Sequence, residues 1–310
     1  MNQEDNKVSI MEKVGVILVN YNGAEYTDSC IESVARSSYT SYEIIIVDNA
    51  STDDSISKIE SKYGNKIHIL KNRCNDGFAK ANNRGIEYAL QIGCDLIMLL
   101  NNDTVVEENL IFELVNCSKK NTKSIISPKI MHFYPNDLIW SAGGEINWIK
   151  GNTLQYGYKV KENEYTKAEK NRKVGFATGC CMLIPKEVIE EIGLLEESYF
   201  LYYEDTDYCM KAKEKGINII YCHSARMYHK VSATTGGSGG NIYIYYSNRN
   251  RLYFNKKYNK NRFFFWIFFI LGSIKKILKW IITRQFKLIK VLIMAICDYK
   301  SGVKGKVTIE

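Results

Sequence analysis

A short apolar segment that ends in four oxygen-bearing side chains is the feature that most constrains this chain. Residues 95–100 have the length and composition of a buried strand. They are followed directly by Asn101, Asn102, Asp103 and Thr104. Ligands bind at the carboxyl ends of strands in parallel sheets, and a carboxylate beside amide oxygens suits a hard divalent cation. The alternative is an ordinary Asx turn that leaves a strand.

Similar apolar segments recur along the first part of the chain and alternate with helical patterns. Residues 14–20, 43–48 and 67–70 have the composition of buried strands, and residues 78–92 that of an amphipathic helix. This alternation predicts an α/β fold with a doubly wound, mostly parallel sheet. After Pro128 the pattern changes to short strands and turns. The sequence contains neither the glycine-rich dinucleotide fingerprint nor a P-loop, which argues against those two nucleotide-binding classes.

The net charge of +8 is concentrated towards the C-terminus. After residue 245 Lys and Arg are frequent, whereas the acidic residues are limited to Asp298 and Glu310. This asymmetry predicts contact with an anionic surface. Because the basic residues are interleaved with long apolar runs, a membrane surface fits better than nucleic acid, and we expect no nucleic-acid partner.

The C-terminal segment has the pattern of a basic amphipathic helix. Residues 263–271 are nine consecutive apolar residues, too few to span a bilayer. Polar positions then recur at steps of three or four on what we predict to be one long helix, at Gly272, Lys276, Lys279, Thr283, Lys287 and Lys290. We expect residues 263–296 to lie on an anionic membrane surface. The alternative is packing on the catalytic domain or on a second copy in a homodimer. The lysines disfavour a membrane span over residues 263–282.

The remaining sequence features concern the cellular compartment and the loops. The nine cysteines form no CxxC pairs, which predicts free thiols in a reducing compartment. Residues 1–13 are polar and lack the apolar core of a secretion signal, so we expect a flexible N-terminus and a cytoplasmic protein. Residues 159–173 resemble an exposed loop, and the Gly/Ser-rich residues 236–240 have the composition of a mobile lid.

Acidic residues follow three of the apolar segments. Carboxylates gathered at strand ends repel one another unless a cation or a base joins them. Asp48 suits either a nucleobase or ribose contact or a helix-capping turn. Asp205 follows an aromatic run in which desolvation would favour a general base. Glu204 and Asp207 fall in the first turn of a predicted helix, where the macrodipole favours acids. A lone His is usually structural, but His229 has an imidazole that suits completion of a metal site with Asp103.

Five ordered motifs resemble family 2 glycosyltransferases of the GT-A fold, and within them bacterial rhamnosyltransferase-like enzymes. They occupy residues 19–22, 47–53, 75–78, 99–104 and 203–207. Residues 143–144, 179–183 and 249–250 also resemble that subgroup. The resemblance covers residues 14–255. It implies a nucleotide-sugar-binding half over 14–128 and an acceptor-binding half over 129–255. The tail 256–310 lies outside the resemblance, and its own pattern predicts membrane association.

The resemblance implies roles for individual residues. Asp205 matches the catalytic base, and Asn101 and Asp103 match the ends of a DxD-type motif that holds Mg²⁺ or Mn²⁺ on the donor diphosphate. His229 matches a metal-binding His of some relatives. Asn101 stands in place of a carboxylate, which weakens metal binding without nucleotide. The implied nucleotide-sugar contacts are Asn20, Tyr21, Asn22, Asp48, Asn75, Gly77, Phe78, Asn102 and Asp103, and the implied acceptor-side residues are Gly179, Glu204, Asp207 and Arg249.

The resulting expectation is an inverting, metal-dependent glycosyltransferase at the inner face of the cell membrane. It implies transfer of a sugar from a nucleoside-diphosphate donor, best dTDP-rhamnose, to a hydroxyl of a lipid-linked or cell-surface polysaccharide. The alternatives are a UDP-hexose transferase of the same family, a non-catalytic nucleotide-sugar-binding membrane scaffold and a metal-dependent nucleotide-sugar hydrolase.

Overall fold

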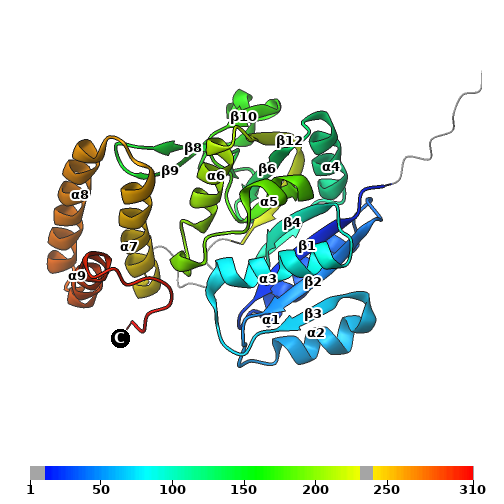
Figure 1. The fold of residues 1–310 in the computed structure, drawn as a ribbon, viewed down its shortest axis with the longest axis horizontal. Helices are drawn as coiled ribbons and strands as arrows, with labels where there is room; N and C mark the ends of the chain where they lie inside the picture. The colour runs from blue at the N-terminus through cyan, green and yellow to red at the C-terminus, as the bar shows by residue number, and fades with distance from the viewer. Residues whose placement is uncertain (1–10, 231–239, 310) are drawn as a thin grey trace, which may run out of the picture.

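The computed structural model describes residues 11–230 and 240–309, so most of the N-terminal segment 1–13 and most of the predicted lid at 236–240 lie outside the described residues. An α/β domain with one large sheet carries three further helices at its C-terminal side (Figure 1). The main path of the sheet has the strand order β10-β12-β6-β11-β4-β1-β2-β3, while β5 pairs with β12 and β7 with β6.

The first half of the domain has the predicted alternation of strands and helices. Its elements are β1 (Val14–Asn20), α1 (Ala24–Ala35), β2 (Tyr42–Asp48), α2 (Ser55–Tyr63), β3 (His68–Lys71), α3 (Gly77–Gln91) and β4 (Leu96–Asn101). β1 pairs in parallel with both β2 and β4, and β2 with β3. The parallel arrangement is therefore confirmed for this half, and it brings the polar ends of β1, β2 and β4 to one edge.

The second half adds antiparallel strands to the parallel ones, so the sheet as a whole is mixed. β11 runs antiparallel between β4 and β6, with Cys181 opposite Leu100. The pairing partner of a strand depends on distant segments, so periodicity alone does not give its direction. The elements are β5 (Thr104–Val106), α4 (Leu110–Lys120), β6 (Ser124–His132), β7 (Ile139–Ser141), β8 (Gly144–Asn147), β9 (Asn152–Gln155), β10 (Arg172–Val174), β11 (Cys181–Pro185), α5 (Lys186–Ile192), α6 (Glu204–Glu214) and β12 (Asn218–His229).

The loop over residues 159–173 is attached to the domain rather than freely solvated. It contains two short 3₁₀ turns, Glu162–Glu164 and Thr166–Glu169. Glu162 forms ion pairs with Lys129 and Arg226, at 2.7 and 2.9 Å.

Helices cover both faces of the sheet. Val14, Val16 and Leu18 of β1 pack with residues of α1, α2 and α4, whereas Ile17 packs with residues of α3, α5 and α6. α3 lies very close to the sheet, since a Cβ at Gly85 would stand 2.6 Å from Ile17 Cγ2. Glycine at this position lets α3 carry its N-terminal end to the polar edge.

The last three helices are α7 (Asn241–Tyr258), α8 (Arg262–Ile282) and α9 (Phe286–Lys300), and they pack as a unit. The prediction of one long helix was wrong. The chain turns between α8 and α9, where Arg284 has φ +55°. The turn allows Trp280 and Leu292 to be buried with Tyr245 of α7. The domain boundary expected at 255 falls inside α7, because α7 continues to Tyr258.

Candidate active site

Asp103 and His229 meet because β5 pairs with the end of β12. β4 ends at Asn101, and a two-residue turn leads into β5, whose Thr104 lies opposite His229. This register places His229 Nε2 3.2 Å from Asp103 Oδ1, with both side chains buried. Trp140 stands edge-on to the imidazole at a ring-centroid distance of 4.6 Å.

Asn101 Oδ1 and His229 Nδ1 are buried and have no hydrogen-bond partner among the described residues. The buried Asp103 Oδ1 faces His229 Nε2 at 3.2 Å, but in an arrangement that is not a hydrogen bond. Unpartnered buried polar atoms are costly, and an amide oxygen, a carboxylate and an imidazole are a donor set that a divalent cation accepts. The part of the chain that the structure describes contains no cluster of three or more His, Cys, Asp or Glu arranged for a metal. A cation held by these residues would take the rest of its ligands from substrate and water.

Asp205 is the second residue of α6 and follows a loop with an unusual backbone. Phe200, Tyr202 and Tyr203 all have φ between +66° and +78°, a region that costs about 1–3 kcal/mol for each such residue. The loop turns the first residues of α6 towards the segment that leads into β11. There the Gly179 N–H donates to Asp205 Oδ2 at 3.0 Å.

Burial and hydrogen bonds act in opposite directions on the two adjacent acids. Burial raises the pKa of Asp205, whereas donation from Gly179 N–H and from the Thr206 N–H and hydroxyl favours its charged form. Burial and the charge of Asp205 hold the pKa of Glu204 well above its usual range, and its Oε2 has no partner among the described residues. Of the two adjacent acids, Asp205 is therefore the one whose charged form its hydrogen-bond donors favour.

One cavity of about 600 Å³ joins these two parts of the site, and we call it the catalytic cavity. Its wall includes Asn101, His229 and Asp205. Further lining residues include Phe78, Trp140, Asn152, Tyr158, Phe176, Gly179, Tyr203, Glu204, Thr206, Tyr243 and Ser247. A reacting group in this cavity can approach Asn101 and His229 as well as the carboxylate of Asp205.

The ends of β1, β2 and β4 are tied together by a buried polar network. Asn20 Nδ2 lies 3.1 Å from Asp48 Oδ1 and within 3.0 Å of the hydroxyls of Ser51 and Ser55. Asn20 Oδ1 accepts from Thr27, which in turn accepts from Asn102 Nδ2. The structure thus brings Asn20, Asp48 and Asn102 together at the strand ends. The amides of Asn20 and Asn102 are engaged inside the network and do not line the catalytic cavity.

The loop after β1 lies against the loop after β2. Tyr21 is half-exposed, and Asn22 has φ +51°. The Thr52 N–H donates to Asn22 Oδ1 at 2.7 Å, and Asn22 N–H donates to Ser51 Oγ at 2.9 Å. Tyr21 therefore stands at an accessible edge beside Asp48, while Asn22 serves to join the two loops.

Asn49 is a buried hub that the sequence reasoning missed. It donates through Nδ2 to Asn75 Oδ1 and to the Gly77 carbonyl, and it accepts from Asn72 and the Asp76 N–H. Asn75 is consequently part of the turn that starts α3. In the sequence, only the position of Asn49 beside Asp48 in the second motif indicated that it has a structural role.

Gly77 and Phe78 directly contact the loop over residues 199–203, which we call the catalytic loop because it leads to Asp205. The Phe78 N–H donates to the Phe200 carbonyl at 2.8 Å. Gly77 has φ +84°, and a Cβ there would stand 2.4 Å from that same oxygen. Phe78 also lines the catalytic cavity. This pair fixes the beginning of α3 to the loop that presents Asp205.

Two of the four predicted acceptor-side residues do not line the catalytic cavity. Gly179 and Glu204 do. Asp207 is fully buried and accepts from Tyr199 Oη and Lys257 Nζ, at 3.0 and 2.8 Å. Arg249 is also fully buried and donates to the carbonyls of Tyr199 and Gly305. These two side chains therefore support the fold instead of facing an acceptor.

Asn250 is the most informative residue that sequence reasoning left without a role. Its Nδ2 lies 2.8–2.9 Å from the carbonyl oxygens of Tyr199, Leu201 and Tyr202. One amide of α7 therefore fixes the backbone of the loop that precedes Asp205. The Arg249-Asn250 pair drew attention to Asn250 in the sequence. Nothing in the neighbouring residues indicated that its amide would bond to the carbonyl oxygens of the loop before Asp205.

Comparison with known proteins identifies the class. The model of the family "Glycosyl transferase family 2" matches residues 15–193, and the chain belongs to this family of glycosyltransferases. It is 28% identical to the low-salt glycan biosynthesis hexosyltransferase Agl10 of Haloferax volcanii, over 78% of this chain and 75% of that protein. It is 27% identical to the dTDP-rhamnosyl transferase RfbF of Shigella flexneri, over 61% and 60%. The N-acetylglucosaminyl-diphospho-decaprenol L-rhamnosyltransferase of Mycobacterium tuberculosis is 23% identical, over 71% and 77%.

Solved structures support the GT-A fold. GalNAc-T7 with UDP, GalNAc and Mn²⁺ aligns with a TM-score of 0.63 and 15% identity, covering 82% of this chain and 49% of that one. Residues 1–349 of Staphylococcus aureus TarS align with a TM-score of 0.51 and 16% identity, covering 78% and 65%. The predicted family and fold are thus confirmed, and the chain is similar to rhamnosyltransferases.

Proposed function

We propose that this glycosyltransferase inverts the anomeric centre of a nucleoside-diphosphate sugar, with Asp205 as the base. Asp205 takes the proton of an acceptor hydroxyl as the oxygen forms its bond to the anomeric carbon and the bond to the diphosphate breaks. The observation that carries this proposal is the catalytic cavity, which joins Asp205 to Asn101 and His229 in one chamber. The Gly179 N–H and Thr206 orient the carboxylate towards that chamber.

Asn101, Asp103 and His229 would hold Mg²⁺ or Mn²⁺. When bound, such a cation stabilises the negative charge that develops on the departing diphosphate. The residues themselves contribute a dry setting, since Asp103 and His229 are both buried. Asp48 and the half-exposed Tyr21 stand at the carboxyl ends of β2 and β1, where they would receive the nucleoside.

The donor proposed is dTDP-rhamnose, and the acceptor a lipid-linked or cell-surface glycan. The names of the relatives from Shigella flexneri and Mycobacterium tuberculosis support both. A UDP-hexose donor is the second candidate, supported by the hexosyltransferase name of the Haloferax volcanii relative.

A thermal-shift screen tests the donor and the metal together. dTDP-rhamnose and UDP-sugars are compared with and without Mn²⁺; a donor at a hundred times its dissociation constant stabilises the fold by about 2.7 kcal/mol. We expect one donor to raise the melting temperature only with metal, and absence of any shift would contradict the donor site. Binding without transfer to extracted acceptors would indicate a scaffold. Release of free sugar at full rate without acceptor would indicate a hydrolase.

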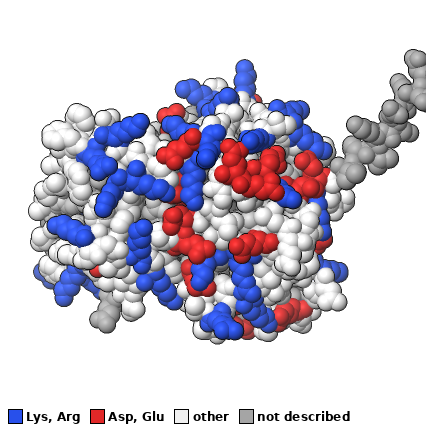
Figure 2. Space-filling model, viewed as in Figure 1, with Lys and Arg blue, Asp and Glu red and all other residues white. Residues whose placement is uncertain are grey.

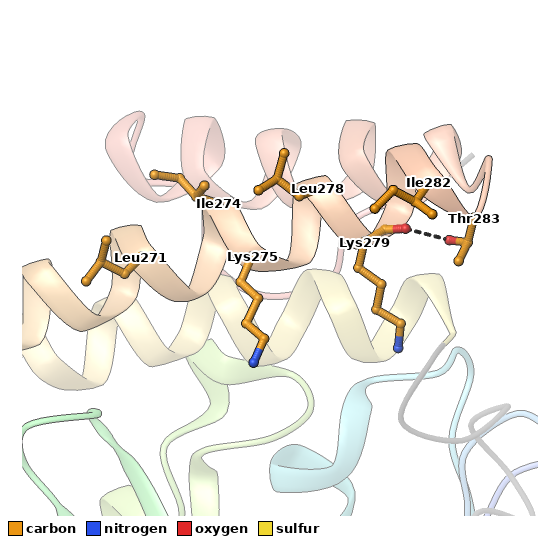
Figure 3. A pocket seen from close by; sticks show the side chains of 7 residues that line it. All are labelled: Leu271, Ile274, Lys275, Leu278, Lys279, Ile282 and Thr283. Atoms are coloured by element: carbon orange, nitrogen blue, oxygen red, sulfur yellow. Dashed lines mark hydrogen bonds between the residues drawn. The ribbon is translucent and has the colours of Figure 1, made fainter.

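We also propose that α8 places the enzyme on the cytoplasmic face of the cell membrane. No helix in the described part of the chain is both long and apolar enough to cross a bilayer. The exposed side chains Phe264, Phe268, Leu271, Ile274, Leu278 and Ile282 form what we call the apolar face of α8. Lys275 and Lys279 extend away from Ile274 and Leu278 (Figure 3). In this arrangement the apolar face can insert into the membrane surface while the lysines contact anionic headgroups.

The charge distribution agrees with this orientation. In the view of Figure 2, Lys and Arg dominate over α7 to α9, whereas the acidic side chains gather over the sheet domain. Flotation with vesicles of phosphatidylcholine and phosphatidylglycerol tests the surface. Leu278→Glu should reduce binding, while Phe112→Glu, which changes an exposed residue of α4, should not. A dimer that dissociates on Leu278→Glu would instead assign the face to a second copy.

A further inference from the structure

A second cavity of about 670 Å³ lies between α7, α8 and the turn before β9, and four cationic side chains line it. We call it the basic pocket, defined by Lys150, Arg251, Lys275 and Lys276. Its other lining residues are Asn152, Tyr203, Tyr243, Ser247, Asn248, Phe268, Leu271, Gly272 and Ser273. Among the described residues that line it there is no Asp or Glu.

The two inner cations of the basic pocket are held by neutral oxygens only. Arg251 donates through Nε and Nη2 to the Lys150 carbonyl, and its guanidinium lies 5.3 Å from the ring centroid of Phe269. Lys276 Nζ donates to Asn248 Oδ1 at 3.3 Å. Within residues 11–230 and 240–309, neither has a carboxylate at ion-pair distance.

Such a pair of neighbouring cations is unfavourable without an anion. Burial lowers the pKa of Arg251 and, together with the Arg251 charge, that of Lys276. Half-buried charges of like sign repel each other and lose hydration. A phosphate group would relieve both effects and would form charge-assisted hydrogen bonds with the guanidinium and the ammonium.

The basic pocket connects the catalytic cavity to the apolar face of α8. Asn152, Tyr203, Tyr243 and Ser247 line both cavities. On the opposite side, Phe268 and Leu271 belong both to the basic pocket and to the apolar face. The structure therefore presents, in spatial order, a general base, a group of cations and an exposed apolar surface.

We propose that the basic pocket binds the phosphate groups of a lipid-linked acceptor. This inference rests on the proposed transferase function and deepens it by naming the acceptor class. The sugar hydroxyl of such a molecule lies in the catalytic cavity near Asp205, its phosphates contact Arg251 and Lys276, and its hydrocarbon chain follows α8 to the membrane. A neutral polysaccharide without a phosphate-linked lipid supplies no anion for this pocket.

Calorimetric titration of the full chain with farnesyl diphosphate tests the site, with farnesol and inorganic pyrophosphate for comparison. EDTA is present so that no divalent cation draws the diphosphate towards Asp103. We expect farnesyl diphosphate to bind more tightly than farnesol or inorganic pyrophosphate. Lys276→Gln should weaken this binding at least tenfold, and Lys276→Arg should restore most of it. Lys279→Gln should change it less than twofold, because Lys279 lies one turn further along α8 and does not line the basic pocket.

Two results would overturn the proposal. One is equal affinity of the wild type and Lys276→Gln for farnesyl diphosphate. The other is a loss in Lys276→Gln of binding to phosphatidylglycerol vesicles alone, which would assign the pocket to general lipid headgroups. The donor-induced melting shift with Mn²⁺ is measured on the same variants. If that shift is absent while farnesyl diphosphate still binds, the transferase proposal fails and the anion site stands.

Discussion

Two parts of the proposed active site, the strand-end network and the loop before Asp205, are stabilised in different ways. On the proposed donor side, Asn20 bonds to Asp48 and to the Thr27 hydroxyl of α1, and Asn102 bonds to the same hydroxyl. On the catalytic side, the loop 199–203 is held by Asn250, a residue about fifty positions later in the chain. The donor side is therefore a self-contained strand-end network, whereas the catalytic loop depends on the helical unit that also forms the proposed membrane surface.

This difference implies that binding and chemistry can be separated by mutation. The strained residues Phe200, Tyr202 and Tyr203 persist because α7 and α3 both bond to their segment. Rigid placement of a catalytic carboxylate favours the reaction because little reorganisation is needed when the substrate arrives. Changes in the helical unit should accordingly affect turnover more than donor binding.

The largest effect is expected for Asp205→Asn, which removes the base and retains the size of the side chain. The amide cannot take the acceptor proton, so transfer should fall by about a thousandfold or more. Donor binding, measured by the thermal shift, should persist because the donor-side network is untouched. Unchanged turnover would remove Asp205 from the role proposed.

Asn250→Ala should produce the next largest effect, through the position of Asp205. Three carbonyl oxygens lose their shared donor, and the loop 199–203 gains access to other backbone conformations. Misplacement of a reacting group by about 1 Å costs on the order of a hundredfold in rate. We expect kcat to fall by this order while the donor-induced melting shift stays within error.

A useful control for that variant is Asn248→Ala, two residues earlier on α7. Asn248 bonds within its own helix and to Lys276, not to the loop. Assayed with a soluble acceptor that lacks phosphate, it should leave kcat nearly unchanged. Equal losses in both variants would indicate general damage to α7 rather than a specific loss of loop positioning.

Asn20→Ala tests the buried polar network at the ends of β1, β2 and β4. It removes the amide that joins Asp48, Ser51, Ser55 and Thr27 and leaves buried polar atoms unpaired. We expect the free energy of unfolding to decrease by about 2 kcal/mol. Chemical denaturation with a constant m-value measures it. An unchanged midpoint would show that the network does not contribute to stability.

The sequence predicts features that depend on local composition better than features that depend on contacts between distant segments. β1, β2 and β4 and their polar ends were predicted because a buried parallel strand has a local composition that periodicity detects. The antiparallel direction of β11 was not, because it depends on which strands it pairs with. The break between α8 and α9 was also missed, since nothing in the spacing of the lysines indicates a left-handed Arg284.

Among the site residues, types were easier to predict than contacts. Asp205 and His229 stood out by residue type and by position after a strand or an aromatic run, and both line the catalytic cavity. Arg249 and Asp207 were indistinguishable from ligand-binding residues in sequence, although both side chains point into the protein. Asn250 required knowledge of which distant carbonyls it contacts.

The smallest effect expected is a shift of the acid limb of the pH profile in Thr206→Val. The base must be ionised, so kcat/KM should fall tenfold per pH unit below the pKa of Asp205, which burial raises. The Thr206 hydroxyl donates to Asp205 Oδ1 at 3.0 Å and favours the charged form. Its removal should raise the pKa further and move the acid limb to higher pH by up to about one unit.

Thr206→Ser keeps the hydroxyl and should leave the limb in place, which separates the hydrogen bond from the loss of a methyl group. A limb that moves to lower pH in Thr206→Val would contradict this direction. Thr206 is adjacent to Asp205 and far in sequence from Asn250. If Thr206→Val shifts the acid limb of the pH profile but keeps full kcat at high pH, the pKa of Asp205 depends on its neighbour in α6 as well as on the contacts from α7. The base would then be positioned by α7 and tuned in its pKa by its own helix.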